Sequence, residues 1–140
     1  MMFKYIISTA FVVFMTGFFL YATKVEQPYL YYQNLPFPVL GEVHAGKAAP
    51  MSVERCNDTD TAQMYPTTHT LKNSATGAEI IFPDVWISIQ PGCHRSTSLL
   101  NKLPEGTPPG RYTFYGLAIV PGLLVSHKIK WYSEEFEVLP

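Results

Sequence analysis

The chain opens with one long apolar stretch and then changes to an alternation of apolar and polar residues with a period of two. The stretch from Tyr5 to Ala22 contains 18 residues without a formal charge and follows Lys4. As an α-helix it would be about 27 Å long, close to the hydrocarbon thickness of a bilayer. The pattern predicts a transmembrane helix over residues 1–24, with these membrane-anchoring side chains: Tyr5, Phe11, Phe14, Phe18, Phe19 and Leu20.

Retention of this segment as a signal-anchor and its removal as a secretory signal are both open. A cleavable signal has an apolar region of about 7–15 residues and a small-x-small cleavage site. The best site here ends in Leu20-Tyr21-Ala22, with a large residue three places before the cut, so retention is favoured. Lys4 and the α-amino group precede the stretch, against Lys24 after it, which places the N-terminus in the cytoplasm. The predicted location is therefore the inner membrane, single-pass, with the C-terminal domain periplasmic or extracellular.

Residues 25–37 are predicted to be an extended linker, because they end in Leu35-Pro36-Phe37-Pro38. The alternative is an aromatic belt at the membrane interface, formed by Tyr21, Tyr29, Tyr31 and Tyr32. The folded domain would then occupy residues 38–140.

Beyond residue 38 the apolar residues recur at every second position, which is typical of half-buried antiparallel strands. Val85, Ile87 and Ile89 share one face, and Trp86 lies on the other. Around residue 130, Ile129 and Trp131 point inward between two lysines that point outward. Such strands have one dry face and one wet face.

Turn signals divide this pattern into short segments. Asn73-Ser74-Ala75-Thr76-Gly77 predicts a five-residue hairpin loop, and Pro121-Gly122 predicts a second reversal. The predicted strands lie near residues 39–43, 50–56, 64–72, 78–82, 85–90, 111–120, 123–132 and 134–139. Residues 96–103 fit either a short helix or an edge loop. The fold class is therefore all-β: an Ig-like antiparallel β-sandwich of about 7–8 strands after one transmembrane α-helix.

Composition agrees with many short strands. All 12 prolines lie at or beyond Pro28, and only 15% of the residues are charged. The formal net charge is −1 and no basic run occurs, so the chain lacks the electrostatic footprint of a nucleic-acid-binding protein.

Two cysteines, Cys56 and Cys93, lie in the predicted ectodomain. In an oxidising compartment such a pair is most simply a structural disulfide, and its loop of 38 residues predicts about 4 kcal/mol of stabilisation at most. Two free thiols, or a redox or metal site, are the alternatives. A redox or metal site is disfavoured because neither cysteine belongs to a C-x-x-C motif. The one adjacent residue that could bind a metal is His94.

A search for chemistry returns no catalytic motif and no cofactor-binding motif. The four histidines are widely spaced, so each is expected to be a surface or turn residue and no metal site is predicted. The sequence thus predicts a protein that is not an enzyme and has no small-molecule substrate.

Aromatic residues suggest where a partner would bind. Nine tyrosines are many for this length, and an exposed Tyr/Trp patch would form a recognition surface. The candidate contact residues are Trp86, Tyr115 and Tyr132, whereas Trp131 is expected in the core. Trp86 could also simply cover a sheet edge.

Three motifs carry a family resemblance: Gly46 before Met51-Ser52-Val53, Pro109-Gly110-Arg111-Tyr112 before a long strand, and the closing Ser133-Glu134-Glu135-Phe136-Glu137-Val138. Together they resemble small single-pass membrane proteins with an Ig-like ectodomain, of bacterial and phage type, over residues 38–140. The chain departs from antibody-type domains, because no Trp follows Cys56 at the usual spacing.

This resemblance implies a membrane-anchored, non-catalytic binding protein in the periplasm or extracellular space. A phage origin and an action on the host envelope are among its implications. Its expected partners are the lipid bilayer and a protein of the envelope. The alternative function is a structural or assembly subunit of an envelope or virion complex.

Overall fold

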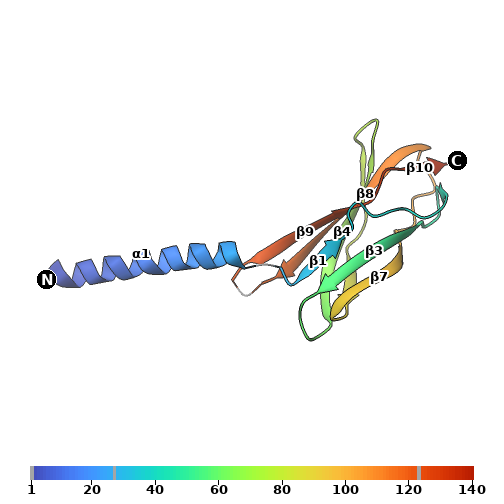
Figure 1. Cartoon of the computed structure of the whole chain (residues 1–140). Coiled ribbons are helices and arrows are strands. Elements are labelled where there is room, and N and C mark those ends of the chain that lie inside the picture. Colours follow the sequence, from blue (N-terminus) through green and yellow to red (C-terminus); the bar gives the residue numbers. More distant parts are fainter. Residues whose placement is uncertain (1, 27, 123) are drawn as a thin grey trace.

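The computed structural model describes residues 2–26, 28–122 and 124–140. One helix, α1 (Met2–Val25), extends away from a compact set of strands and carries the N-terminus at its far end (Figure 1). The side chains of the helix are described for residues 8–23. Most of them are apolar and exposed, and Phe14 stacks on Phe18 with 6.5 Å between ring centroids.

The predicted transmembrane helix is not supported. Over the described residues, no helix combines the length and apolar character that a bilayer crossing requires. Along the helix, the hydroxyls of Thr16 and Thr23 donate to the main-chain carbonyls of Val12 and Leu20.

Several predictions depended on that helix and are corrected with it. They are the anchoring role of Phe11, Phe14, Phe18, Phe19 and Leu20, and the single-pass inner-membrane location with a periplasmic domain. The side chain of Tyr5, the remaining predicted anchor, lies outside the described side chains.

In the described part of the chain, ten strands follow the helix. In chain order they are β1 (Leu30–Gln33), β2 (Val43–His44), β3 (Pro50–Asn57), β4 (Gln63–Asn73), β5 (Glu79–Ile81), β6 (Val85–Ile89), β7 (Gly92–Leu99), β8 (Gly110–Pro121), β9 (Ser126–Tyr132) and β10 (Phe136–Leu139). The predicted hairpin loop joins β4 to β5, where the N–H of Asn73 donates to the carbonyl of Ala78.

The strands form two sheets that pack face to face as a β-sandwich. The small sheet has the order β1-β3-β7, and the large sheet has the order β2-β10-β8-β4-β5. In addition, β6 pairs with β4 and β9 pairs with β8. The β2–β10 pair is parallel, whereas the prediction was wholly antiparallel.

Two strands lie where the sequence pattern predicted none. Strand β1 falls within the stretch predicted as a linker and pairs with β3. Strand β7 includes the first half of the unassigned stretch and also pairs with β3. Both lie at sheet edges, and β7 is exposed along nearly its whole length, so it lacks the apolar alternation of a half-buried strand.

The core fills the space between the sheets, with Trp131 near its centre as predicted. Its ring centroid lies 5.8 Å from that of Phe37 and 6.0 Å from that of Phe114. The close approach of Trp131 to β8 requires a glycine, because a Cβ at Gly116 would lie 2.0 Å from its Cε2 atom. A second cluster of buried apolar residues includes Tyr65 and Val120.

The predicted disulfide between Cys56 and Cys93 is present. The two residues are direct register partners on β3 and β7, with Cα atoms 4.1 Å apart. The bond therefore holds the exposed edge strand β7 to the centre of the small sheet. Cys93 lies near the start of β7.

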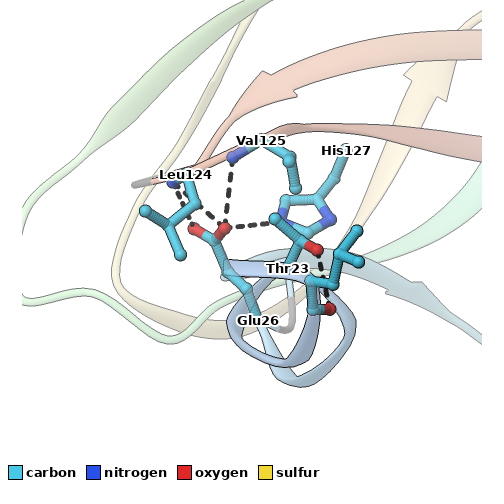
Figure 2. Close-up of polar contacts among 6 residues, drawn as sticks. Thr23, Glu26, Leu124, Val125 and His127 are labelled. Atoms are coloured by element: carbon cyan, nitrogen blue, oxygen red, sulfur yellow. Dashed lines mark hydrogen bonds and ion pairs between the residues drawn. The ribbon is translucent and has the colours of Figure 1, made fainter. Parts of the chain in front are cut away.

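A single carboxylate connects the end of the helix to the sandwich. The backbone N–H groups of Leu124 and Val125 donate to Glu26 at 3.1 and 3.3 Å (Figure 2). Nε2 of His127, at the start of β9, lies 3.9 Å from the same carboxylate. Glu26 thus contacts the β8–β9 connection, far from the helix in sequence.

Candidate functional site

The first candidate site is the outer face of the large sheet, and it contains all three predicted contact residues. Tyr115 on β8 and Tyr132 on β9 are register partners, with ring centroids 6.4 Å apart. Trp86, on β6, has an exposed fraction of 66%. Because strand side chains alternate, residues on one face of β4, β6, β8 and β9 converge there. We define this aromatic face as Met64, Trp86, Tyr115, Ile119 and Tyr132, all of which are exposed.

A shallow groove of about 580 Å³ crosses part of the aromatic face. It forms because the short side chains of Thr68 and Thr70 on β4 lie beside the larger Tyr115 and Tyr132. Lys130 lines one side of the groove. On the other side, Lys72 lies 3.4 Å from Glu79 and is partly neutralised by it.

Lysines border the aromatic face along β9. Lys128 and Lys130 alternate with the buried residues of that strand and are exposed. Neither forms an ion pair with any residue that the structure describes. The border beside β9 is therefore positively charged.

The second candidate site lies between the two sheets, where the edge strands β6 and β7 leave an opening. One cavity of about 320 Å³ has polar groups from Arg55, His69, Ser98 and Asn101. Its apolar walls come from Met51, Val85, Ile87, Leu99, Leu100 and Phe114. A smaller cavity of about 130 Å³ continues past Arg55 toward His94 and Ser96. We call the two together the inter-sheet slot.

Arg55 lies where the two cavities meet. Its Nη2 donates to the hydroxyl of Ser98 at 2.8 Å, and its Nη1 donates to the hydroxyl of Ser96 at 3.3 Å. Its Nε is buried and has no hydrogen-bond partner. Among the described residues, no carboxylate lies within ion-pair distance of this guanidinium.

His69, on β4, faces the same slot with an exposed fraction of 8%. The prediction that each histidine is a surface or turn residue is wrong for this one. Its Nδ1 lies 2.5 Å from Oδ1 of Asn101, an arrangement in which the ring donates and the amide accepts. Burial lowers the pKa of His69, and the hydrogen bond to Asn101 opposes that shift only in part. The neutral ring then has its lone pair at Nε2, which is buried without a partner.

Two tyrosines extend the polar groups of the slot into the core. The hydroxyls of Tyr32 and Tyr65 lie 2.9 Å apart, one from each sheet. Burial raises the pKa of both hydroxyls, and the hydrogen bond to Tyr32 raises that of Tyr65 further, so both stay protonated. Neither tyrosine therefore contributes a negative charge to the interior beside Arg55.

Sequence reasoning did not single out Arg55, although one signal for it exists. In Met51-Ser52-Val53-Glu54-Arg55, a period of two places Arg55 on the same inward face as Met51 and Val53. A charged residue in phase with core residues is unusual and points to a specialised site. Its contacts with β7 could not be found this way, because that strand was not predicted.

Neither site has the features of a metal centre in the described part of the chain. No group of three or more His, Cys, Asp and Glu side chains there could hold a metal ion. The described residues offer two features at these sites: an aromatic face with a basic border, and a slot with a half-buried guanidinium that has no carboxylate partner.

Comparisons with known proteins give only distant structural similarities. No family model and no curated protein matches the chain. The alkylpurine DNA glycosylase AlkC of Pseudomonas fluorescens, bound to DNA containing an abasic site analog, is 14% identical over 82% of this chain, with a TM-score of 0.48. This chain spans 32% of the glycosylase chain. The solution structure of a protein described as late embryogenesis abundant (LEA) is 16% identical, over 96% of this chain and 88% of that one, with a TM-score of 0.44. At such low identities and TM-scores, neither similarity bears on what this chain does.

Proposed function

We propose that this chain is a non-catalytic binding protein that docks another protein on its aromatic face. The observation that carries the proposal is the gathering of five exposed apolar side chains on one flat sheet surface, Trp86 and Tyr115 among them. Exposed apolar side chains that adjoin one another mark interaction sites, and Trp and Tyr are the residues that contribute most to such interfaces.

The border defines the chemistry of the partner. Lys128 and Lys130 flank the face on β9, so a complementary partner has an apolar centre and acidic residues beside that strand. The lysines would mainly increase the association rate, whereas Trp86 and Tyr115 would contribute most of the affinity.

Site-specific photo-cross-linking in the cells that make the full chain tests the proposal. A photoreactive residue at position 86 or 115 should cross-link one and the same protein. The matched control position is Leu99, which is more exposed than either residue but lies on the small sheet. Equal cross-linking of that protein from position 99 would contradict the proposal.

A binding measurement with the identified protein completes the test. We expect Trp86→Ala to weaken the complex about tenfold or more, because truncation of a central aromatic residue typically costs 2 kcal/mol or more. Leu99→Ala should leave the affinity unchanged. Unchanged affinity for Trp86→Ala would also overturn the proposal.

The helix supports a second candidate function, that of an assembly subunit. Phe11, Val12, Val13 and Phe14 are consecutive and exposed, so the apolar surface extends around this turn of the helix. Such a helix is normally covered, and the covering surface in this hypothesis is the same helix of further copies. Light scattering on the full chain distinguishes the two functions. A stoichiometric oligomer that Phe14→Glu dissociates and Trp86→Ala leaves intact favours assembly.

A further inference from the structure

We propose that the inter-sheet slot binds a small organic acid, with its carboxylate at Arg55 and its apolar body between β6 and β7. This site is separate from the aromatic face, since it opens between the sheets and not on the outer surface of one. The proposal therefore goes beyond the docking function and does not depend on it.

The charge of Arg55 is the first argument. Arg55 is half-buried: its Nε is enclosed, whereas its contact with Ser96 is exposed to solvent. The enclosed part of a guanidinium is costly to bury unless an anion compensates it. Two of its five N–H groups donate to the neutral hydroxyls of Ser96 and Ser98, and Arg55 also interacts with the hydroxyl of Tyr32. Its buried Nε–H remains unpaired. A carboxylate is the natural complement, because guanidinium donors match its two oxygens in a planar, charge-assisted pair.

The apolar walls are the second argument, because they exclude a simple inorganic anion as the best ligand. Ile87 on β6 and Leu99 on β7 flank the opening, and Phe114 lies at its base. The larger cavity, about 320 Å³, lies in the range of small-molecule sites. A ligand with a ring or short hydrocarbon body would fill it and would keep its charged end at Arg55.

His69 is the third argument, and it defines the ligand further. Its ring is held by Asn101 and presents a lone pair at the buried Nε2. That atom would accept a hydrogen bond from a hydroxyl or N–H group on the ligand. The best ligand is thus an aromatic or aliphatic acid that has a hydrogen-bond donor beside its apolar body.

NMR titration of the unmodified full chain tests this inference directly. The probe is benzoate, and its neutral isostere benzamide is the matched control. Benzoate should shift the Nε–H resonance of Arg55 and the indole N–H of Trp131, which lines the slot. The resonances of Arg95, exposed on β7 and paired with Glu54 at 2.8 Å, and of Trp86 should stay in place. Benzamide should bind at least about tenfold more weakly, because it is neutral and cannot form the charge-assisted pair with the guanidinium.

Three results would overturn the inference. They are equal affinity for benzoate and benzamide, shifts confined to Trp86 and Arg95, and no shift with benzoate up to about 10 mM. None of them requires a variant, so a substitution that disturbs folding cannot obscure the outcome.

Variants then test whether Arg55 supplies the positive charge that binds the carboxylate. Arg55→Gln should lower the benzoate affinity about tenfold, and Arg95→Gln should leave it unchanged. Equal losses would contradict the role of Arg55. A short peptide with a free terminal carboxylate and an aromatic last residue separates two sources of the same chemistry. Tighter binding of the peptide identifies a protein terminus as the ligand, and tighter binding of benzoate identifies a free acid.

Discussion

The two faces of strand β8 differ completely in what surrounds them. Phe114 faces inward with an exposed fraction of 0%, whereas the next residue, Tyr115, faces outward with 40%. The same alternation continues along the strand, with Ala118 buried and Ile119 exposed. Residues that hold the sandwich together and residues available to a partner are thus neighbours in sequence. Under the proposed docking function, substitutions one position apart would therefore alter stability and binding independently.

The largest expected effect is the difference in stability between truncating the inward side chain of this pair and truncating the outward one. Phe114→Ala should lower the free energy of unfolding by about 3–5 kcal/mol, because it leaves a cavity among Phe82, His69 and Trp131. Tyr115→Ala should change it by about 0.5 kcal/mol at most. Chemical denaturation of the full chain measures both. Similar losses at the two positions would break the comparison.

A smaller effect is expected at Gly116, where the inner face of β8 has no room for a side chain. Gly116→Ala would place a Cβ 2.0 Å from the buried ring of Trp131, so the ring or the strand must shift. We expect a loss of about 1–3 kcal/mol, typical of overpacking. The matched control is Gly106→Ala, because a Cβ there meets no atom within 4 Å. A stable Gly116→Ala chain with an unmoved Trp131 resonance would contradict the packing described above.

The smallest effect is a pH dependence from the inner face of β4. Burial lowers the pKa of His69 below its ordinary value of 6.5, and Arg55 lowers it further against the opposing Asn101 and Asp84. As the pH falls below about 6.5, the unfolded chain takes up a proton that the folded chain does not. Stability should therefore fall with decreasing pH, by no more than about 1.4 kcal/mol per pH unit for one proton.

The ring-proton resonances of His69 give the direct readout of that prediction. A titration midpoint below 6.5 in the folded chain is expected. A midpoint at or above 6.5 would show that the ring is not desolvated as its burial indicates. Removal of the group by His69→Gln should flatten the pH dependence of unfolding.

The alternation that separates the faces of β8 also explains how much of the fold was predictable. Strands β4, β8 and β9 bury one face each, so their period of two is visible in the sequence. Strand β7 is exposed along most of its length and consists largely of polar residues, so its pairing with β3 leaves no such signal. Its position depends on long-range register, including the Cys56–Cys93 bond.

The sites were predictable to a similar extent. Trp86, Tyr115 and Tyr132 were assigned to an outward face because local alternation determines which side a residue occupies. The inter-sheet slot combines Arg55 from β3 with Ser96 and Ser98 from β7 and His69 from β4. Local pattern does not encode which strands become neighbours across the two sheets. The helix was mispredicted for a different reason. Its hydrophobicity alone was taken to predict a membrane-spanning helix.

The disulfide has a consequence for the integrity of the chain once it is cut. The exposed hairpin loop between β4 and β5 lies between Cys56 and Cys93 in sequence. Exposed loop tips are the preferred sites of proteolytic nicking. A protease that cleaves this loop would leave two pieces joined through sulfur, and strands from both pieces would still pair across the sandwich. The nicked molecule would keep its mass, apart from one added water, until a reductant released the fragments.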